Sequence, residues 1–156
     1  MIKALVLTIS DRASKWIYED KSGPAIEHIL KTGIQDVEIT RSMVSDDPKE
    51  IEGAFILNLS MDFIITTGGT GIGPRDNTPE VTENFCDRLL PGIPEFLRME
   101  SCRQTTHAVL SRAVAGVSGK TIIINLPGSE RGARFCAGLL VPVLPHAKKM
   151  LEGGGH

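Results

Sequence analysis

A cluster of glycines in the middle of the chain stands directly before an arginine and an aspartate. The residues are Gly68, Gly69, Gly71, Gly73, Arg75 and Asp76. Glycine reaches positive φ and has no Cβ atom, so a phosphate group can approach the backbone N–H groups of such a loop. The guanidinium of Arg75 suits phosphate oxygens, whereas Asp76 would repel a phosphate unless a cation such as Mg²⁺ lay between them. These residue types predict a phosphate-binding loop with a cation site.

The segments on either side of the glycines are typical of a strand and a helix. Residues 62–67 form a short β-branched apolar run, which predicts a buried strand. Thr78, Pro79 and Glu80 then supply a helix N-cap, a proline at the first helical position and an acid in the first turn. A strand, a glycine loop and a helix start present backbone N–H groups to an anion. The alternative is a glycine-rich turn with solvated charges, which the number of glycines disfavours.

Two common phosphate-binding fingerprints do not match this loop. Gly68 and Gly73 have the separation of a P-loop, but Pro74 and Arg75 stand where lysine and serine or threonine are required. A dinucleotide fingerprint that starts at Gly69 would need a third glycine at the position of Pro74. The sequence therefore favours neither a Walker NTPase nor a standard NAD-dependent dehydrogenase.

The rest of the chain alternates between strand-like and helix-like segments. We expect strands at residues 2–9, 37–44 and 62–67, and a hairpin of residues 111–117 and 120–125 around Ser118-Gly119. Helices are expected at residues 22–33 with Ser22 as cap, from Pro48 onward, at 79–88, at 95–104 and from Ser129, the last interrupted by Pro142 and Pro145. This pattern predicts an α/β domain with a mainly parallel sheet and one late hairpin.

Small or polar residues follow each expected strand. They are Ser10-Asp11, Asp46-Asp47, residues 68–76 and residues 125–129. Open α/β sheets bind ligands at the carboxyl ends of their strands, so we expect these four loops to converge on one site. Either Asp46 or Asp47 is expected to cap the helix at Pro48, which leaves the other carboxylate available at the strand end.

Composition narrows the class of protein. The 156 residues suffice for one domain, expected at residues 1–152 with a tail at 153–156. The chain is 41% hydrophobic and 23% charged, as is ordinary for a globular protein. Its net charge of −2 gives no general attraction to nucleic acid or to an anionic membrane, and its aromatic content of 4% disfavours a base-stacking surface.

The cysteines and the first residues of the chain indicate the cellular compartment of the protein. Cys86, Cys102 and Cys136 are odd in number and widely spaced, which fits neither a disulfide framework nor a zinc site and favours free thiols in a reducing cytosol. Residues 1–3 lead into a strand-like run and not into a secretory signal. No apolar stretch approaches the ~20 residues that cross a bilayer. We therefore expect a cytoplasmic protein.

Several blocks occur along the chain in a familiar order. They are Thr8–Arg12, Glu19–Gly23, Thr66–Gly71, Pro74–Asp76, Thr78–Glu80, Pro91–Gly92, Leu110–Arg112, Asn125–Ser129 and Leu144–Ala147. Together they resemble the molybdenum-cofactor biosynthesis family of the MogA/MoaB type, which includes the G domains of gephyrin and of the plant Cnx proteins. The resemblance implies a three-layer α/β/α fold, usually a homotrimer, and molybdopterin adenylyltransferase activity. In that reaction the terminal phosphate of molybdopterin attacks the α-phosphate of MgATP, and the product passes to a metal-inserting step.

The resemblance also implies roles for individual residues. The family's nucleotide site matches Gly68, Gly69, Thr70, Gly71, Asn125, Leu126, Pro127, Gly128 and Ser129. Its two important aspartates match Asp46 and Asp76, which are expected to be catalytic and to hold Mg²⁺. Positions around its pterin and phosphate pocket match Ser10, Asp11, Ser111 and Arg112, and Arg75 is expected to contact phosphate there.

One position departs from the family pattern. The family usually has valine after the loop aspartate, where this chain has Asn77. A polar residue there affects helix packing or Mg²⁺ hydration but removes no named catalytic group. A non-catalytic molybdopterin-binding paralogue of the same fold is the alternative to the enzyme. The presence of both Asp46 and Asp76 weighs against it, because a binder would need neither.

Overall fold

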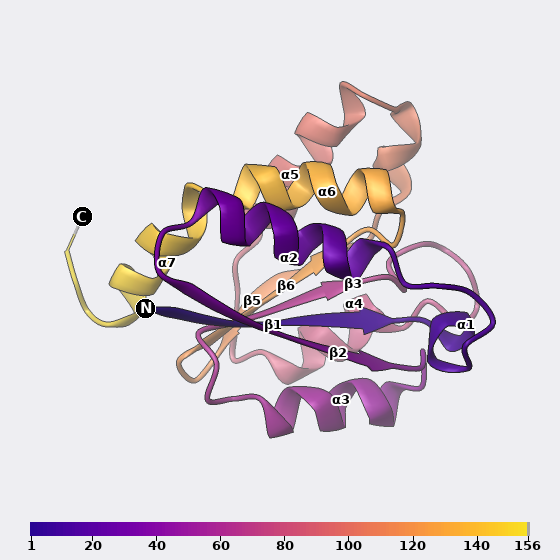
Figure 1. Cartoon of the computed structure of the whole chain (residues 1–156), viewed down its shortest axis with the longest axis horizontal. Helices are drawn as coiled ribbons and strands as arrows, with labels where there is room; N and C mark the ends of the chain where they lie inside the picture. The colour runs from indigo at the N-terminus through magenta and orange to yellow at the C-terminus, as the bar shows by residue number, and fades with distance from the viewer. Residues whose placement is uncertain (156) are drawn as a thin grey trace.

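A computed structural model describes residues 1–155 and contains a six-stranded sheet between two layers of helices (Figure 1). The strand order is β2 (Val37–Val44), β1 (Ile2–Ile9), β3 (Phe63–Thr67), β6 (Thr121–Leu126), β5 (Ala115–Ser118) and β4 (Arg88–Leu89). The first four strands are parallel, and β5 and β4 are antiparallel to their neighbours. The expected α/β/α fold with a late hairpin is confirmed.

Helices cover both faces of the sheet (Figure 1). One face packs against α2 (Ser22–Gly33), α5 (Gly92–Cys102), α6 (Glu130–Leu140) and α7 (Val143–Leu151), and the other against α3 (Pro48–Leu57) and α4 (Thr78–Phe85). In β3, Phe63 and Ile65 belong to the first core and Ile64 to the second. This double burial explains why the strand is apolar at consecutive positions. Each such side chain contributes about 1.5–3 kcal/mol when fully buried.

Local signals set several helix starts as expected. The side chain of Asp47 accepts a hydrogen bond from the backbone N–H of Lys49, so Asp47 caps α3 and Asp46 does not. Ser129 caps α6 through the N–H of Gly132. The expected break of the last helix separates α6 from α7.

Two predicted caps are wrong. Asp20 accepts from the N–H of Gly23 at the start of α2, whereas Ser22 lies inside the helix. The Thr78 hydroxyl donates to the carbonyl oxygen of Gly68 (3.0 Å) and does not cap α4, because the glycine loop folds back onto this helix.

Short elements escaped the sequence patterns. One turn of helix, α1 (Asp11–Ser14), follows β1, and a 3₁₀ helix, η1 (Thr106–Leu110), follows α5. The helix expected at 79–88 ends at Phe85, because the chain then forms β4 beside β5. The helix expected at 95–104 is α5, which begins earlier, at Gly92, because Pro94 is tolerated in a first helical turn.

Among residues 1–155 no helix combines the length and the apolarity that crossing a bilayer requires. The tail expected at 153–156 ends at His156, which lies outside the described residues.

Candidate active site

The carboxyl ends of the four parallel strands lie side by side. In the register of the sheet Ile9 pairs with Val44, Thr8 pairs with Thr67, and Thr67 pairs with Leu126. The loops that follow these strands therefore leave the sheet at one edge. The convergence that the sequence predicted is present, and the contacts below join the loops directly.

Two aspartates from different loops, Asp11 and Asp46, each accept a hydrogen bond from the other's backbone N–H. The N–H of Asp11 donates to Oδ2 of Asp46 (2.9 Å), and the N–H of Asp46 donates to Oδ1 of Asp11 (3.0 Å). Arg75 adds a fork, since its Nε and Nη2 donate to the two carboxylate oxygens of Asp11, each at 2.9 Å. Three predicted site residues thus form one cluster.

The glycine loop passes too close to its neighbours for larger residues. Gly68 and Gly69 have φ values of +104° and +67°. A Cβ atom on Gly68 would collide with the carbonyl oxygen of Ile9, and one on Gly69 would lie 3.0 Å from Oδ1 of Asp46. The second carboxylate oxygen of Asp46 therefore faces the loop.

Asp76 covers the other end of the same loop. Its Oδ2 accepts from the N–H of Gly73 (2.9 Å), and a Cβ atom on Gly71 would lie 2.8 Å from that oxygen. Asp46 and Asp76 thus approach the glycine loop from two sides, and both carboxylates are directed at the loop backbone.

Arg112 holds the glycine loop in place. Its Nε donates to the carbonyl oxygen of Gly71 and its Nη2 to that of Asp76, both at 2.7 Å. Its backbone N–H donates to the carbonyl oxygen of Thr70 (2.9 Å), and its guanidinium is paired with Glu80. Arg112 was predicted to lie near phosphate. Here its guanidinium donates to two loop carbonyls and is paired with Glu80 of α4, so Arg112 fixes the shape of the loop, and its contact with phosphate stays a prediction.

The block at residues 125–129 contacts the glycine loop from the side of β6. The buried Asn125 donates to the hydroxyls of Thr66 (3.0 Å) and Thr82 (2.9 Å). The N–H of Gly68 donates to the carbonyl oxygen of Leu126, and Gly128 lies against Gly68 so closely that a Cβ atom there would be 3.1 Å from its Cα. These residues fix the loop to the sheet.

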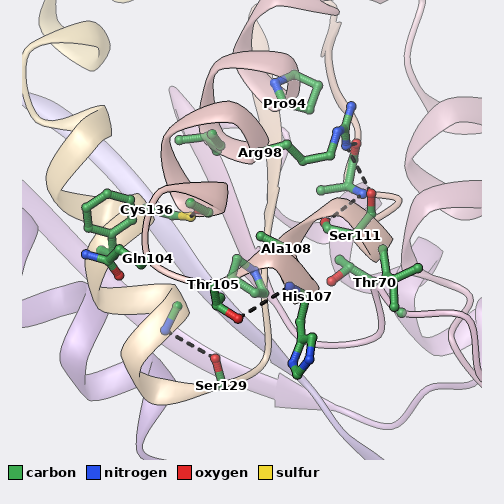
Figure 2. A pocket seen from close by; sticks show the side chains of 18 of the residues that line it. Thr70, Pro94, Arg98, Gln104, Thr105, His107, Ala108, Ser111, Ser129 and Cys136 are labelled. Atoms are coloured by element: carbon green, nitrogen blue, oxygen red, sulfur yellow. Dashed lines mark hydrogen bonds between the residues drawn. The ribbon is translucent and has the colours of Figure 1, made fainter.

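A cavity of about 430 Å³ opens beside the loop, between α5, η1 and the start of α6 (Figure 2). The predicted site residues that line it are Thr70, Gly71, Ser111, Asn125, Pro127 and Ser129. Ser10, Asp11, Asp46, Gly68, Gly69, Arg75, Asp76, Leu126, Gly128 and Arg112 are not part of its lining. The predicted set therefore falls into a charged cluster and a neighbouring cavity wall.

The other wall of the cavity was missed by sequence reasoning. It includes Arg98, Ser101, Gln104, Thr105, His107, Ala108, Phe135 and Cys136. Figure 2 shows Arg98 beside Ser111, and its Nη1 donates to the carbonyl oxygens of Ser111 (3.3 Å) and Ala113 (2.9 Å). The thiol of Cys136 lies 3.5 Å from the hydroxyl of Ser101. No motif marks these residues, because α5 and η1 reach the site only through packing.

The pKa values of the two aspartates in the cluster are shifted in opposite directions. Burial raises the pKa of Asp46, and the charges of Asp11 and Asp76 raise it further, against the opposing hydrogen bond from the Asp11 N–H. The hydrogen bonds from Arg75 lower the pKa of Asp11. Positive charge placed near Asp46 would relieve the repulsion among the three carboxylates.

Comparison with known proteins identifies relatives of this chain. Residues 5–146 match the family model described as "Probable molybdopterin binding domain". The molybdopterin adenylyltransferase of Helicobacter pylori strain 26695 is 41% identical over 152 residues, which cover 95% of this chain and 86% of that protein. The Escherichia coli K12 protein of the same name is 35% identical over 133 residues, 83% of this chain and 68% of that protein.

A solved structure is similar over nearly the whole length. The crystal structure of the molybdopterin biosynthesis enzyme MoaB from Thermus thermophilus superposes with a TM-score of 0.88 at 40% identity, covering 98% of each chain. The motifs, the sheet topology and these likenesses agree. The chain belongs to the MogA/MoaB family of molybdenum-cofactor biosynthesis proteins, whose members share this molybdopterin-binding domain.

Proposed function

We propose that this protein is a molybdopterin adenylyltransferase. In the proposed reaction a terminal phosphate oxygen of molybdopterin attacks the α-phosphorus of ATP, the bond to the β-phosphate oxygen breaks, and pyrophosphate leaves. The observation that carries the proposal is the approach of Asp46 and Asp76 to one glycine loop beside a cavity. The curated relatives that carry this name support it.

The reaction asks for positioning and charge compensation. A phosphate nucleophile is ionised at neutral pH, so no general base is needed, and the enzyme must bring two anions together for in-line displacement. Backbone N–H groups of residues 69–71 suit the phosphates, whereas the N–H of Gly68 donates to Leu126. Arg75 is 60% exposed at its side chain, so a phosphate group can compete with Asp11 for its guanidinium.

Asp46 and Asp76 are the residues that would hold Mg²⁺. Oδ1 of Asp46 faces Gly69, and the carboxylate of Asp76 lies over Gly71 and Gly73, so both fit a cation held at the loop. Mg²⁺ is usually bound through one or two carboxylates and substrate phosphates. When bound, Mg²⁺ would neutralise charge on the phosphates.

The cavity is the proposed place for the nucleoside of ATP. It borders Thr70 and Gly71 on one side and Asn125, Pro127 and Ser129 on the other, so a nucleoside there would direct its phosphates toward the loop. Molybdopterin would then approach from the side of Ser10 and Asp11. Ser111 lines the cavity and remains a proposed contact of molybdopterin or its phosphate.

The remaining expectations concern the protein's surroundings. We propose a homotrimer in the cytoplasm that hands adenylyl-molybdopterin to a molybdenum-inserting protein. Analytical ultracentrifugation tests the trimer. A non-catalytic molybdopterin-binding paralogue remains the alternative, and the retention of both aspartates disfavours it.

One assay tests the proposed activity. The purified protein is mixed with molybdopterin, ATP and Mg²⁺, and adenylyl-molybdopterin is sought by mass, with pyrophosphate release as a second readout. Product that depends on Mg²⁺ is the expected result. If molybdopterin binds but no product forms, the protein is the non-catalytic molybdopterin-binding paralogue. If neither substrate binds, the functional assignment is overturned.

A further inference from the structure

Asn77 connects the two loops that carry Asp46 and Asp76. Its Nδ2 donates a hydrogen bond to the backbone carbonyl oxygen of Asp46 (3.0 Å), across 31 residues of sequence. A carbonyl oxygen only accepts hydrogen bonds, so the contact requires the amide NH₂ group, which valine lacks. The polar residue that departs from the family pattern therefore has a definite partner, and that partner is a proposed catalytic residue.

This bond completes the fixation of Asp46. The backbone N–H of Asp46 donates to Asp11, its Oδ2 accepts from Asp11, and its carbonyl oxygen accepts from Asn77. Asp11 ties Asp46 to the loop after β1, whereas Asn77 ties it to the glycine loop. With three anchors in place, Oδ1 of Asp46 is the oxygen that faces Gly69.

Asn77 makes this contact in place of a local one. It stands at the N-cap position of α4, where asparagine commonly accepts a hydrogen bond from the helix backbone, yet its side chain makes no capping bond. The amide is used between loops instead. The preceding residue, Asp76, accepts a hydrogen bond from Arg112 at its backbone carbonyl oxygen.

We infer that Asn77 is a positioning residue, which sets the separation of the Asp46 and Asp76 carboxylates by holding the Asp46 loop against the glycine loop. The inference rests on the proposed adenylyltransferase function. Asn77 itself touches neither substrate in this scheme and acts through Asp46. Residues that orient metal-binding carboxylates in this way typically change activity or metal affinity by 10- to 100-fold when replaced.

The test compares Asn77→Leu with Asn58→Leu. Leucine has nearly the shape of asparagine and cannot donate. Asn58 is a matched control, because it is also half-buried and its Nδ2 donates to a backbone carbonyl oxygen, that of Ala54 (2.8 Å), at the far end of α3. Asn77→Leu is expected to lower kcat about tenfold and to raise the Mg²⁺ concentration that gives half-maximal rate, with a smaller change in KM for ATP. Asn58→Leu is expected to keep both at the wild-type values.

A second readout does not depend on activity. Hydrogen exchange of the peptide covering residues 43–48 is expected to become faster in Asn77→Leu and to stay unchanged in Asn58→Leu, because only the first loses the anchor of Asp46. Unchanged exchange would show that the contact is unimportant, and faster exchange with wild-type kcat would overturn the positioning role. If the wild type makes no adenylyl-molybdopterin, the proposed function fails. If the wild type is active and Asn77→Leu has the same kcat, the positioning role of Asn77 is overturned, whereas the proposed function stands.

Discussion

The charged cluster and the cavity beside it are built by different means. In the cluster, Asp11, Asp46 and Arg75 come from three loops and are joined by hydrogen bonds between side chains and backbone. In the cavity, α5, η1 and α6 meet, and one of its two arginines, Arg98, donates to backbone carbonyls, whereas Arg131 lies at the start of α6. Under the proposed function, the charged cluster would bind the phosphates and the cation, and the cavity would bind the ring system of the nucleoside. A substitution in one region should then leave the property assigned to the other region unchanged.

The largest effect is expected at Asp46 and Asp76, the two aspartates that face the glycine loop. Asp46→Asn and Asp76→Asn keep an oxygen acceptor at each position but remove the charge, so kcat should fall by about 100-fold or more while the fold is retained. The rate of adenylyl-molybdopterin formation measures kcat, and thermal unfolding shows whether the fold is retained. Turnover close to wild type in Asp76→Asn would contradict the proposed metal site.

A smaller effect is expected when the cavity is filled. Ala108 lies on η1 and lines the cavity wall (Figure 2), so Ala108→Trp should obstruct the nucleoside. KM for ATP should rise about tenfold, roughly 1.4 kcal/mol of binding free energy, while kcat at saturation stays near wild type. Steady-state kinetics with varied ATP measures both. A rise in KM for molybdopterin alone would assign the cavity to the pterin.

A change of pH dependence should reveal the coupling inside the cluster. Asp11 stays ionised while Asp46 titrates, because Arg75 lowers the pKa of Asp11 and burial raises that of Asp46. Asp11→Asn removes a repelling charge but keeps the backbone N–H that donates to Asp46, so the pKa of Asp46 should fall. If the active form needs ionised Asp46, the acid limb of the kcat profile moves to lower pH. A limb that stays in place or moves upward would show that another group titrates there.

Neighbouring aspartates should behave differently. Asp47→Ala removes the cap of α3 and should lower the free energy of unfolding by about 1 kcal/mol, with kcat unchanged. Urea unfolding and the transferase assay measure the two effects. Loss of activity in Asp47→Ala at full folding would extend the charged cluster beyond Asp46.

The smallest effect concerns the exposed aromatic residue near the cluster. Trp16 is 89% exposed and has φ of +59°, a conformation that costs L-residues about 1–2 kcal/mol. Trp16→Gly relieves this strain, partly offset by the entropy of glycine, and should stabilise the protein by about 0.5 kcal/mol. KM for both substrates should not change, since ring recognition is assigned to the cavity. A higher KM in this variant would place ring recognition in the charged half as well.

Local chemistry explains why much of the fold could be predicted. Asp47 and Ser129 cap helices through contacts two or three residues away, and Gly119 turns the hairpin at positive φ. Such features depend on residue type and short spacing, which are visible in the chain. The parallel strands were visible too, because helices on both faces make them apolar at consecutive positions. β4 has two residues and depends on its partner β5, so no local pattern marked it.

The sequence by itself determined the residue types at the site and the order of the elements that carry them. The glycines of the loop, the carboxylates at the strand ends and the resemblance of the motifs were sufficient to predict Asp46 and Asp76 at the same edge of the sheet. Only the tertiary structure decided how they are held: Arg75 forks onto Asp11 across 64 residues, and Asn77 reaches Asp46 across 31. The cavity wall of α5 and η1 likewise exists only after packing. The physical reason is that these contacts join residues far apart in the chain. Sheet register and helix packing bring them together, and no local sequence pattern reveals such pairs.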